Sequence, residues 1–529
     1  MKTDVIIIGG GLAGMVCALE LLDRNLNVVL LDRRDEKSLG GLARWAMGGL
    51  FYVDSPFQRK AKIKDSPELA LSDWLSYAEF EPGDDLPRAW AEQYVHRCTE
   101  EVYEWLKPKG VKYVPSVQWL ERGLEQRGNS VPRFHVVWGA GHGLVQALKK
   151  NLYQHPRFGQ LKMLFQHKAT ELIRSNGRVS GVQVLNELQN EAFELEASAV
   201  IIAAGGITGD VEVVKRNWYA PWGKAPEDLL SGSHLQANGE IHGVAQRAGA
   251  HITHLDKQWN YAAGVHHPDA EHGRHGLSVI PPKSALWLNW RGERIGPRPL
   301  VAGYDTRYLV ERICQEEKTY TWQVLNRKIA LKELAVSGSA YNDALREQRT
   351  LAFIGNLLFG NRSLLDTLST RCPDVLMAHS VEELSGKMNA LTGDAAVDAA
   401  RLRATLESWD REVAKGDASS DEQMQLLARL REYSGDRMRM AGPQPILDPD
   451  AGPLIAIREF ILTRKSLGGI QTDLQSRVLQ PDGQPIAGLF AVGEAAGFGG
   501  GGIHGRRALE GTFLGNCVFT SRIAVKSLT

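Results

Sequence analysis

A glycine-rich turn near the start of the chain constrains its fold more than any other feature. Residues 4–8 form a short, mostly β-branched run that is suited to a strand buried on both faces. Gly9, Gly11 and Gly14 follow in the spacing Gly-x-Gly-x-x-Gly, and an amphipathic helix is expected directly after them. The order of strand, glycine turn and helix predicts an α/β unit that binds a dinucleotide.

Each glycine of this turn has its own physical role. Gly9 allows the tight turn, Gly11 lets a pyrophosphate approach the backbone, and Gly14 lets the helix pack closely on the strand. The N-terminus of the helix then faces the phosphates. A second apolar strand, residues 28–31, leads to Asp32, whose carboxylate can accept a hydrogen bond from an adenosine ribose. NAD and FAD both contain this ADP half, so the turn does not separate them.

Three later segments favour the flavin dinucleotide. Residues 40–49 (GGLARWAMGG) form a second glycine-rich loop, where an extended dinucleotide would continue toward its flavin. Residues 199–206 (AVIIAAGG) form another buried strand that ends in small residues, and residues 488–494 form a strand that ends at Glu494. The chain has 54 glycines in 529 residues, above the average of about 7%. Many of them lie in these segments, on the expected path of one FAD.

The composition narrows the class of protein further. Lys and Arg number 62 and Asp and Glu number 62, which favours a folded chain and argues against nucleic acid as a partner. The five cysteines are scattered without Cys-x-x-Cys spacing, which argues against a disulfide framework, attached haem or an iron–sulfur cluster and favours the cytoplasm. No apolar run reaches the ~18 residues of a spanning helix, so no transmembrane segment is expected. The first residues fit a strand, turn and helix better than a signal peptide.

Two further segments identify a family. Residues 465–473 (KSLGGIQTD) and residues 488–515 (GLFAVGEAAGFGGGGIHGRRALEGTFLG), together with the first glycine turn, resemble the flavoprotein superfamily of fumarate reductase, succinate dehydrogenase and ketosteroid dehydrogenase. The resemblance is greatest to a bacterial branch of FAD-binding dehydrogenases related to ketosteroid dehydrogenase, and it covers nearly the whole chain. It implies an α/β fold in which a mainly helical α+β capping domain is inserted into a Rossmann-type FAD-binding domain.

The expected domain boundaries follow from a change in the sequence pattern. Residues 259–440 show little strand pattern and several amphipathic segments, such as 381–388 and 399–413, so they are predicted to form the capping domain that supplies substrate contacts. Residues 1–258 and 441–529 are predicted to form the FAD-binding domain.

The resemblance also implies which residues contact FAD. Glu494 would hold the ribityl chain, and a helix beginning near Gly511 would direct its N-terminus at flavin N1 and the C2 carbonyl, where negative charge develops on reduction. Respiratory members attach FAD through a histidine in the second glycine-rich loop, and Leu42 stands at the matching position, so FAD is expected to be non-covalent. The expected FAD-binding residues are Gly9, Gly11, Leu12, Ala13, Gly14, Asp32, Arg33, Gly40, Gly41, Ala43, Gly48, Gly49, Ala169, Ala203, Ala204, Gly205, Gly468, Gly493, Glu494, Gly511, Thr512, Phe513 and Leu514.

The implied reaction is hydride transfer between flavin N5 and a CH–CH group of an enone or an unsaturated acid or ketone. Lys465 and Arg464 precede the Gly-Gly pair of the family motif, where a substrate-binding histidine stands in fumarate reductases. Arg507 can hold a carboxylate or enolate oxygen, His504 follows four glycines, and Tyr304 is a candidate for proton transfer. Each of these residues also has an alternative, purely structural role. Lys465 would neutralise carboxylates on a cleft wall, Arg507 would form a surface salt bridge, His504 would cap the next helix and Tyr304 would pack in the core.

Fumarate itself fits the sequence poorly. The segment that matches the catalytic arginine motif of fumarate reductases, residues 292–299, lacks its Asn-Glu pair, and Ala508 occupies the strict position of a second arginine. A fumarate-type reductase of a small unsaturated acid therefore remains an alternative, as does a non-catalytic flavin-binding electron carrier. The substrate is expected to be a small molecule, and the electron acceptor or donor is unidentified. The His-rich run at 266–275 lacks ligand spacing on a helix, so no metal is expected.

Overall fold

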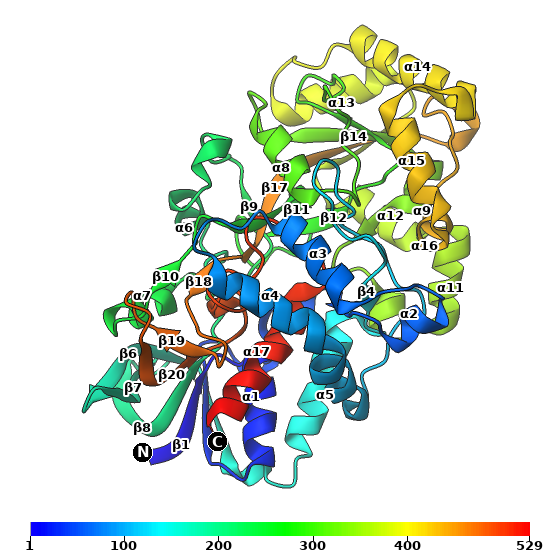
Figure 1. The fold of residues 1–529 in the computed structure, drawn as a ribbon. Coiled ribbons are helices and arrows are strands. Elements are labelled where there is room, and N and C mark those ends of the chain that lie inside the picture. Colours follow the sequence, from blue (N-terminus) through cyan, green and yellow to red (C-terminus); the bar gives the residue numbers. More distant parts are fainter. Residues whose placement is uncertain (1, 529) are drawn as a thin grey trace. The chain divides into compact units, whose positions relative to one another are not determined.

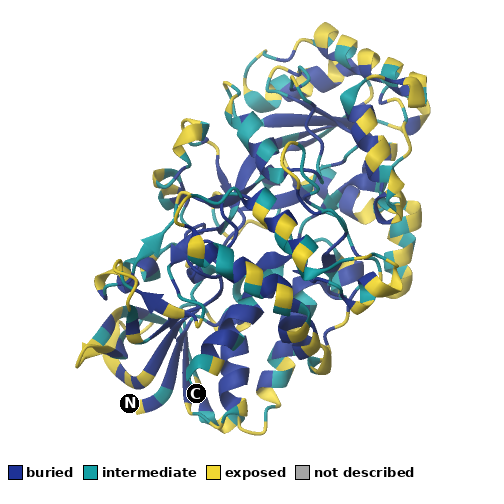
Figure 2. Cartoon of the chain, in the orientation of Figure 1, coloured by how far each residue is buried: buried dark blue, intermediate teal, exposed yellow. Residues whose placement is uncertain are grey.

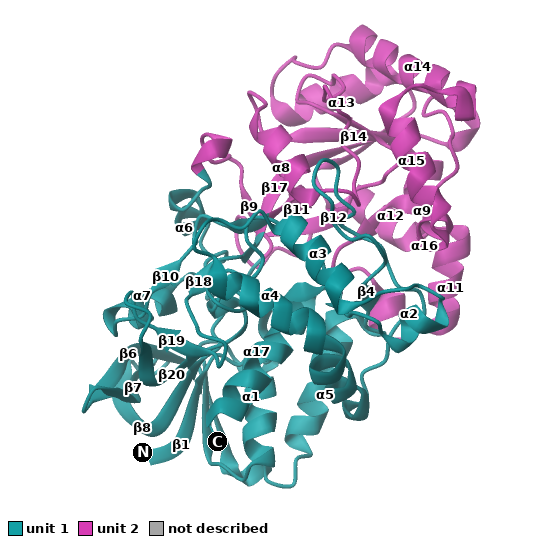
Figure 3. Ribbon diagram, in the orientation of Figure 1, with its two compact units in different colours: residues 1–219, 233–259, 464–529 teal, residues 220–232, 260–463 magenta. Residues whose placement is uncertain are grey.

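The computed structural model describes residues 2–528, which form two compact units (Figure 3). Unit 1 comprises residues 1–219, 233–259 and 464–529, and unit 2 comprises residues 220–232 and 260–463. The predicted return of the chain at residue 441 is earlier than the observed one, because strand β17 (Leu454–Ser466) pairs with β14 (Thr321–Asn326) and β16 (Val375–Ala378). Residues 220–232 join unit 2 through β9 (Leu230–Ser231), which pairs in parallel with β17.

Unit 1 is built on an eight-stranded sheet whose centre is parallel (Figure 1). The strand order is β19-β20-β8-β1-β2-β5, β7 pairs with β8, and β6 pairs with β7. The parallel pairs join β20 to β8, β8 to β1, β1 to β2 and β2 to β5. The strands are β1 (Lys2–Ile8), β2 (Val28–Asp32), β5 (Leu161–Phe165), β6 (His167–Ser175), β7 (Arg178–Asn186), β8 (Glu191–Ile202), β19 (Arg477–Leu479) and β20 (Pro485–Ala491).

The predicted strand, glycine turn and helix are all present in unit 1. In β1, Val5 pairs with Val28 of β2 and with Ala199 of β8, and the strands are coloured as buried in Figure 2. Helix α1 (Leu12–Asp23) is buried from Leu12 to Leu22 and packs against α17 (Thr512–Leu528) and α5 (Ala140–Tyr153). Continuous apolar runs such as 4–8 and 28–31 are typical of parallel strands that are buried on both faces. The structure contains these strands and the helix between them, so the predicted mixed α/β fold is confirmed.

The remaining elements of unit 1 lie outside this sheet. Its other helices are α2 (Pro56–Lys60), α3 (Pro67–Ala78), α4 (Asp85–Cys98), α6 (Val211–Arg216) and α7 (Glu240–Arg247). Two small antiparallel pairs join β3 (Gly49–Phe51) to β4 (Phe134–Val136) and β10 (Ile252–Thr253) to β18 (Gly469–Ile470).

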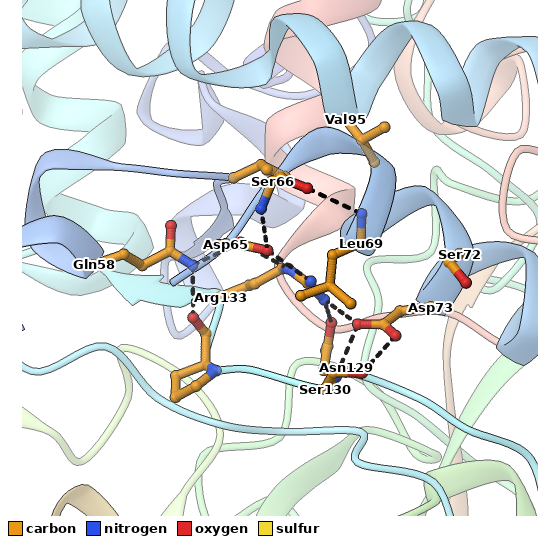
Figure 4. Close-up of polar contacts among 12 residues, drawn as sticks. Gln58, Asp65, Ser66, Leu69, Ser72, Asp73, Val95, Asn129, Ser130 and Arg133 are labelled. Carbon is orange, nitrogen blue, oxygen red and sulfur yellow. Dashed lines mark hydrogen bonds and ion pairs between the residues drawn. The ribbon is translucent and has the colours of Figure 1, made fainter. Parts of the chain in front are cut away.

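A buried ion-pair network fixes the segment that leads into α3 and the segment that leads into β4 (Figure 4). The guanidinium of Arg133 donates to both carboxylate oxygens of Asp65 at 2.8 and 2.9 Å and to Asp73 at 2.7 Å. All three side chains are fully buried. Asp73 and Tyr77 both lie in α3, so this network anchors the helix that carries Tyr77.

Unit 2 contains a second eight-stranded sheet, in the order β13-β14-β17-β11-β12-β15, with β16 and β9 paired to β17. The prediction of little strand structure in residues 259–440 was therefore wrong. These strands are buried nearly throughout, so their sequences lack the alternation of polar and apolar residues that marks a half-exposed strand. The further strands are β11 (Gln258–His266), β12 (Gly276–Ile280), β13 (Leu286–Leu288) and β15 (Ala335–Val336).

Helices form the rest of unit 2. The predicted amphipathic segments at 381–388 and 399–413 are helices α13 (Val381–Thr392) and α14 (Ala399–Lys415). The Ser380 side chain caps α13 by accepting a hydrogen bond from the backbone N–H of Glu383 at 3.1 Å. The others are α8 (Thr306–Cys314), α9 (Arg327–Glu333), α10 (Asp343–Arg346), α11 (Thr350–Phe359), α12 (Arg362–Arg371), α15 (Glu422–Glu432) and α16 (Ser434–Arg439). None of the helices within residues 2–528 is long and apolar enough to span a membrane.

Candidate active site

The two predicted glycine-rich loops lie against each other in unit 1. The backbone N–H of Gly40 donates to the Gly10 carbonyl at 2.8 Å, and Gly40 forms a bridge with Gly11. The Asp32 carboxylate accepts a hydrogen bond from Gly10 N–H at 2.7 Å and another from Arg34 N–H at 2.7 Å. The acidic end of β2 is thus held beside the turn before α1, as the dinucleotide motif requires.

Two glycines of this turn are required by packing within the protein, and a third is explained only by a bound ligand. An added Cβ would lie 1.9 Å from the Gly9 carbonyl oxygen at Gly14 and 2.5 Å from the Ala203 carbonyl oxygen at Gly9, so both glycines are required by the protein itself. At Gly11 an added Cβ would meet only the Ala203 oxygen, at 3.9 Å, and φ is an ordinary −69°. Nothing in the chain requires a glycine at position 11, and a phosphate group that approaches the backbone explains it. The residues therefore fit FAD.

The other predicted FAD-binding residues are spread along unit 1. Ala203 continues β8 and donates from its N–H to Ile8 O at 2.8 Å; Gly205 follows with φ of +80°. Arg33 forms ion pairs with Glu187 at 2.7 Å and Glu240 at 3.1 Å. Leu12 and Ala13 lie in the first turn of α1, and Gly41, Ala43, Gly48 and Gly49 lie in or beside the second glycine-rich loop. Ala169 lies in the core of the sheet, and Ala204 follows β8. Gly468 packs on the backbone of His254, and Gly493 precedes Glu494. Their contacts with FAD stay a prediction.

A histidine that the sequence did not single out lies beside the second glycine-rich loop. The His234 ring lies 6.3 Å from the Trp45 ring, edge to face, and its Nδ1 has no hydrogen-bond partner. Burial lowers the pKa of His234 to about 3, and the charges of Arg34 and Arg44 act in the same direction. No spacing motif surrounds His234, so only the tertiary structure shows this buried histidine.

The end of β17, the loop after β20 and the start of α17 meet at a second polar cluster in unit 1. The Glu494 carboxylate accepts a hydrogen bond from Ser466 N–H at 2.9 Å. Burial raises the pKa of Glu494 to about 7, against the effects of this hydrogen bond and of Lys465 and Arg464. Gly511, with φ of +94°, precedes Thr512, Phe513 and Leu514 in the first turn of α17. The predicted carboxylate and the helix N-terminus are thus both present.

Lys465 is the buried cation of this cluster. Its ammonium lies 3.9 Å from the centroid of the Phe513 ring. Burial lowers the pKa of Lys465 to about 8; Glu510 opposes this shift and Arg464 adds to it. A lysine in this environment holds its proton weakly, so it can donate a strong hydrogen bond to a substrate oxygen.

His504 is fully buried beside Lys465 and its hydrogen-bonding role can be assigned. The Thr512 hydroxyl donates to Leu509 O at 2.5 Å, so at 2.7 Å from His504 Nε2 it accepts a hydrogen bond from the ring. The proton is therefore on Nε2, and Nδ1 is a bare acceptor without a partner. Burial and the charge of Lys465 lower the pKa of His504 to about 3, which keeps the ring neutral.

Arg507 is held by residues that sequence reasoning missed. Its Nε donates to Glu79 at 2.9 Å, and its guanidinium lies 5.5 Å from the Tyr77 ring. The Tyr77 hydroxyl donates to the buried carboxylate of Glu121, a short contact, and Glu121 also contributes to the field at Lys465. Tyr77, Glu79 and Glu121 come from a segment with no recognisable motif.

Tyr304 lies in unit 2, whereas the other predicted catalytic residues lie in unit 1. It is buried, and its hydroxyl donates to Leu426 O at 2.8 Å. Arg464 stands at the first position after the unit 2 part of β17, and Thr208 donates to its carbonyl at 3.3 Å. The catalytic roles of Tyr304 and Arg464 stay predictions.

The His-rich run has its own internal contacts. His266 Nδ1 lies 2.8 Å from an oxygen of Asp374, and the ring of His275 stacks on the rings of His267 and His272 at 4.4 and 4.9 Å. Within residues 2–528, no group of three or more His, Cys, Asp and Glu side chains is arranged to hold a metal ion.

Comparison with known proteins identifies the family. Residues 4–514 match the family model described as FAD binding domain. The chain is 43% identical to the KsdD-like steroid dehydrogenase of Mycobacterium tuberculosis, over 99% of this chain and 95% of that protein. Two solved structures share the fold along the whole chain. The 3-ketosteroid Δ1-dehydrogenase of Sterolibacterium denitrificans has a TM-score of 0.70 at 15% identity and is covered over 99% of its length. The 3-ketosteroid Δ4-(5α)-dehydrogenase of Rhodococcus jostii has a TM-score of 0.66 at 20% identity and is covered over 96%.

The fold and the glycine cradle define a flavin-dependent oxidoreductase, as the sequence predicted. The chain belongs to the FAD-binding domain family, and its class is that of dehydrogenases and reductases that act on CH–CH groups.

Proposed function

We propose that this protein removes two hydrogens from adjacent carbons of a ketosteroid and forms an enone. The observation that carries the proposal is the identity of 43% with a KsdD-like steroid dehydrogenase over nearly the full length of both chains. The candidate active site supports it, because Lys465 is a buried cation against an aromatic ring, which suits a carbonyl oxygen on an apolar molecule.

The residues of unit 1 would hold the cofactor in a defined orientation. The turn at Gly11 and the N-terminus of α1 bind the pyrophosphate, Asp32 binds the adenosine ribose, and Glu494 binds the ribityl chain. The N-terminus of α17 stabilises negative charge on the flavin ring. FAD, when bound, supplies the acceptor for the hydride that leaves the substrate carbon. We further propose that FAD is non-covalent, since Leu42 cannot form the bond that a histidine forms.

Lys465 and a tyrosine would handle the substrate carbonyl and the proton. The Lys465 ammonium donates to the ketone oxygen and stabilises the enolate charge that develops when the neighbouring carbon loses its proton. For the proton we favour Tyr77, because its hydroxyl donates to the Glu121 carboxylate, which can take a proton from it. Tyr304 donates to a backbone carbonyl, which cannot. His504 Nδ1 is too weak a base for this step and serves as a hydrogen-bond acceptor.

Unit 2 would be the capping domain that closes over the substrate. The match of the family model runs through the whole of unit 2, which supports this role. We also propose a reducing, cytoplasmic location, since all five cysteines lie among the described residues and all are free thiols. The electron acceptor would be a separate molecule such as a quinone, a carrier protein or oxygen.

The test is anaerobic mixing of the flavin-loaded protein with a saturated 3-ketosteroid. Loss of the oxidised-flavin absorbance, with a product lighter by one H2, is the expected result. Reduction of fumarate by reduced viologen, without any response to steroids, would instead support the fumarate-type alternative. Tyr77→Phe and Tyr304→Phe then discriminate the two tyrosines: Tyr77→Phe should lower kcat by about 10²-fold or more, and Tyr304→Phe should leave kcat within a few-fold.

A further inference from the structure

The central strands of the unit 2 sheet contain a group of buried polar atoms without partners. Both carboxylate oxygens of Glu459 in β17 are buried and accept no hydrogen bond, and the same holds for Thr463 Oγ1 in the same strand. Gln323 Oε1 in β14 and both amide atoms of Asn260 in β11 also lack partners. β14 and β11 flank β17, so the orphaned atoms lie on three adjacent strands.

The strand register places several of these groups on one face of the sheet. Glu459 pairs with Thr321, and Ile457 pairs with Gln323, in antiparallel register. Side chains of paired residues share a face, as do residues two apart along a strand, so Glu459 and Gln323 are diagonal neighbours about 7–8 Å apart. Thr463 lies on the same face, about 13 Å along β17 from Glu459.

Along β17, Glu459 has apolar neighbours on its own face of the sheet. Ile457 and Ile461 flank it on the same face of β17, and both are fully buried. Thr321 Oγ1 accepts a hydrogen bond from Trp287 Nε1 at 2.8 Å, so its hydroxyl hydrogen remains a donor. Burial alone raises the pKa of Glu459 well above its ordinary value, which favours the neutral carboxyl, and a neutral carboxyl offers one donor and one acceptor.

Glu333, another buried carboxylate of unit 2, has a structural role in which hydrogen bonds from the chain satisfy both of its oxygens. Glu333 accepts hydrogen bonds from Ser284 N–H at 2.9 Å, from the Ser284 hydroxyl at 2.6 Å and from Ala441 N–H at 2.6 Å. Buried polar groups in native proteins are nearly always satisfied in this way. A fully buried carboxyl that makes no hydrogen bond within the chain has room in its hydrogen bonding for a ligand or a water.

We infer that this face of the unit 2 sheet binds the oxygen function of a neutral, apolar ligand. Glu459 and Gln323 would bind a single hydroxyl or ketone group, and Ile457 and Ile461 would contact the hydrocarbon around it. A neutral carboxyl both donates and accepts, so it suits either oxygen function, whereas an anionic ligand would have no cation to meet at these residues. The inference concerns unit 2 alone and does not depend on the reaction proposed above.

The experiment compares three probes on the flavin-loaded full-length protein by calorimetry: androstan-17-ol (androstanol), androstan-17-one (androstanone) and the hydrocarbon androstane. None has the ring-A ketone of the proposed substrate, so failure of the proposed reaction leaves this test intact. In the wild type, both oxygenated probes are expected to bind about tenfold tighter than androstane. Glu459→Leu should abolish that preference, and Glu459→Gln should keep most of it, because an amide also donates and accepts.

A second readout separates a ligand site from a buried water. The infrared band of the neutral Glu459 carboxyl, identified by its loss in Glu459→Gln, should shift when androstanol or androstanone binds and stay unchanged with androstane. Thermal denaturation checks folding, and Glu459→Leu should unfold at a temperature no lower than the wild type. Equal binding of the three probes by the wild type, an unchanged preference in Glu459→Leu, or a band that responds only to hydrogen–deuterium exchange would overturn the inference.

Discussion

Replacement of Gly11 by alanine should weaken FAD binding much more than it destabilises the folded apoprotein. The added Cβ would lie 3.9 Å from the Ala203 carbonyl oxygen, an ordinary van der Waals distance, and φ is −69°. The only cost to the fold is that alanine is a poorer helix N-cap than glycine, so the apoprotein should lose less than about 1 kcal/mol of unfolding free energy.

The cost to FAD binding should be larger. The methyl group would occupy the space where the pyrophosphate approaches the backbone, and overpacking of this kind costs ~1–3 kcal/mol. The Kd for FAD should therefore rise by about 5- to 150-fold in Gly11→Ala. Gly14→Ala is the matched control, because its Cβ would lie 1.9 Å from the Gly9 carbonyl oxygen. That backbone clash should destabilise the apoprotein by ~3 kcal/mol or more.

The assay has two parts. Urea denaturation of the FAD-free proteins gives the unfolding free energies, and quenching of FAD fluorescence on binding gives the Kd values. If Gly11→Ala destabilises the apoprotein as much as Gly14→Ala does, Gly11 serves packing. If Gly11→Ala binds FAD with the wild-type Kd, no phosphate lies at this backbone.

Four further results are expected. The pKa of Lys465 is lowered to about 8, so its charge is present below that pH and lost above it; kcat/KM for a ketosteroid should fall as the pH rises through about 8, and this alkaline limb should be absent in Lys465→Arg. Lys465→Met should lower kcat by about 10²–10³-fold in steady-state assays at pH 7, and activity near that of the wild type would exclude its role. Arg133→Met leaves Asp65 buried without its cation and leaves Asp73 with Arg127 alone, so it should cost about 3–5 kcal/mol in denaturant unfolding (Figure 4), and a loss below 1 kcal/mol would contradict the network. Acid precipitation should leave all flavin colour in the supernatant, and a yellow pellet would show a covalent bond.

Much of the FAD-binding unit could be read from local patterns. The strand at 28–31, the helix after Gly11 and the strand before Glu494 each depend on residues close together in the sequence, so spacing and periodicity were sufficient, although that last strand, β20, ends at Ala491 and not at Glu494. The sheet of unit 2 could not be read in this way. Its strands are buried on both faces, and residues 321–326 and 454–459 pair across more than a hundred residues of chain.

In the candidate catalytic cluster too, some residues could be predicted from local sequence patterns and others could not. Lys465 and His504 stood out beside family motifs, but Tyr77, Glu79 and Glu121 did not, because an isolated tyrosine or glutamate has no spacing signal. Their roles depend on contacts with residues far along the chain, such as Arg507 with Glu79.

The sequence by itself determined that the cofactor is a dinucleotide, because a dinucleotide binds to backbone that only a fixed spacing of glycines leaves open. Only the tertiary structure decided the charge states of the candidate catalytic groups. The lowered pKa values of Lys465 and His504 and the raised pKa of Glu494 all arise mainly from burial, and burial depends on which distant segments cover a side chain.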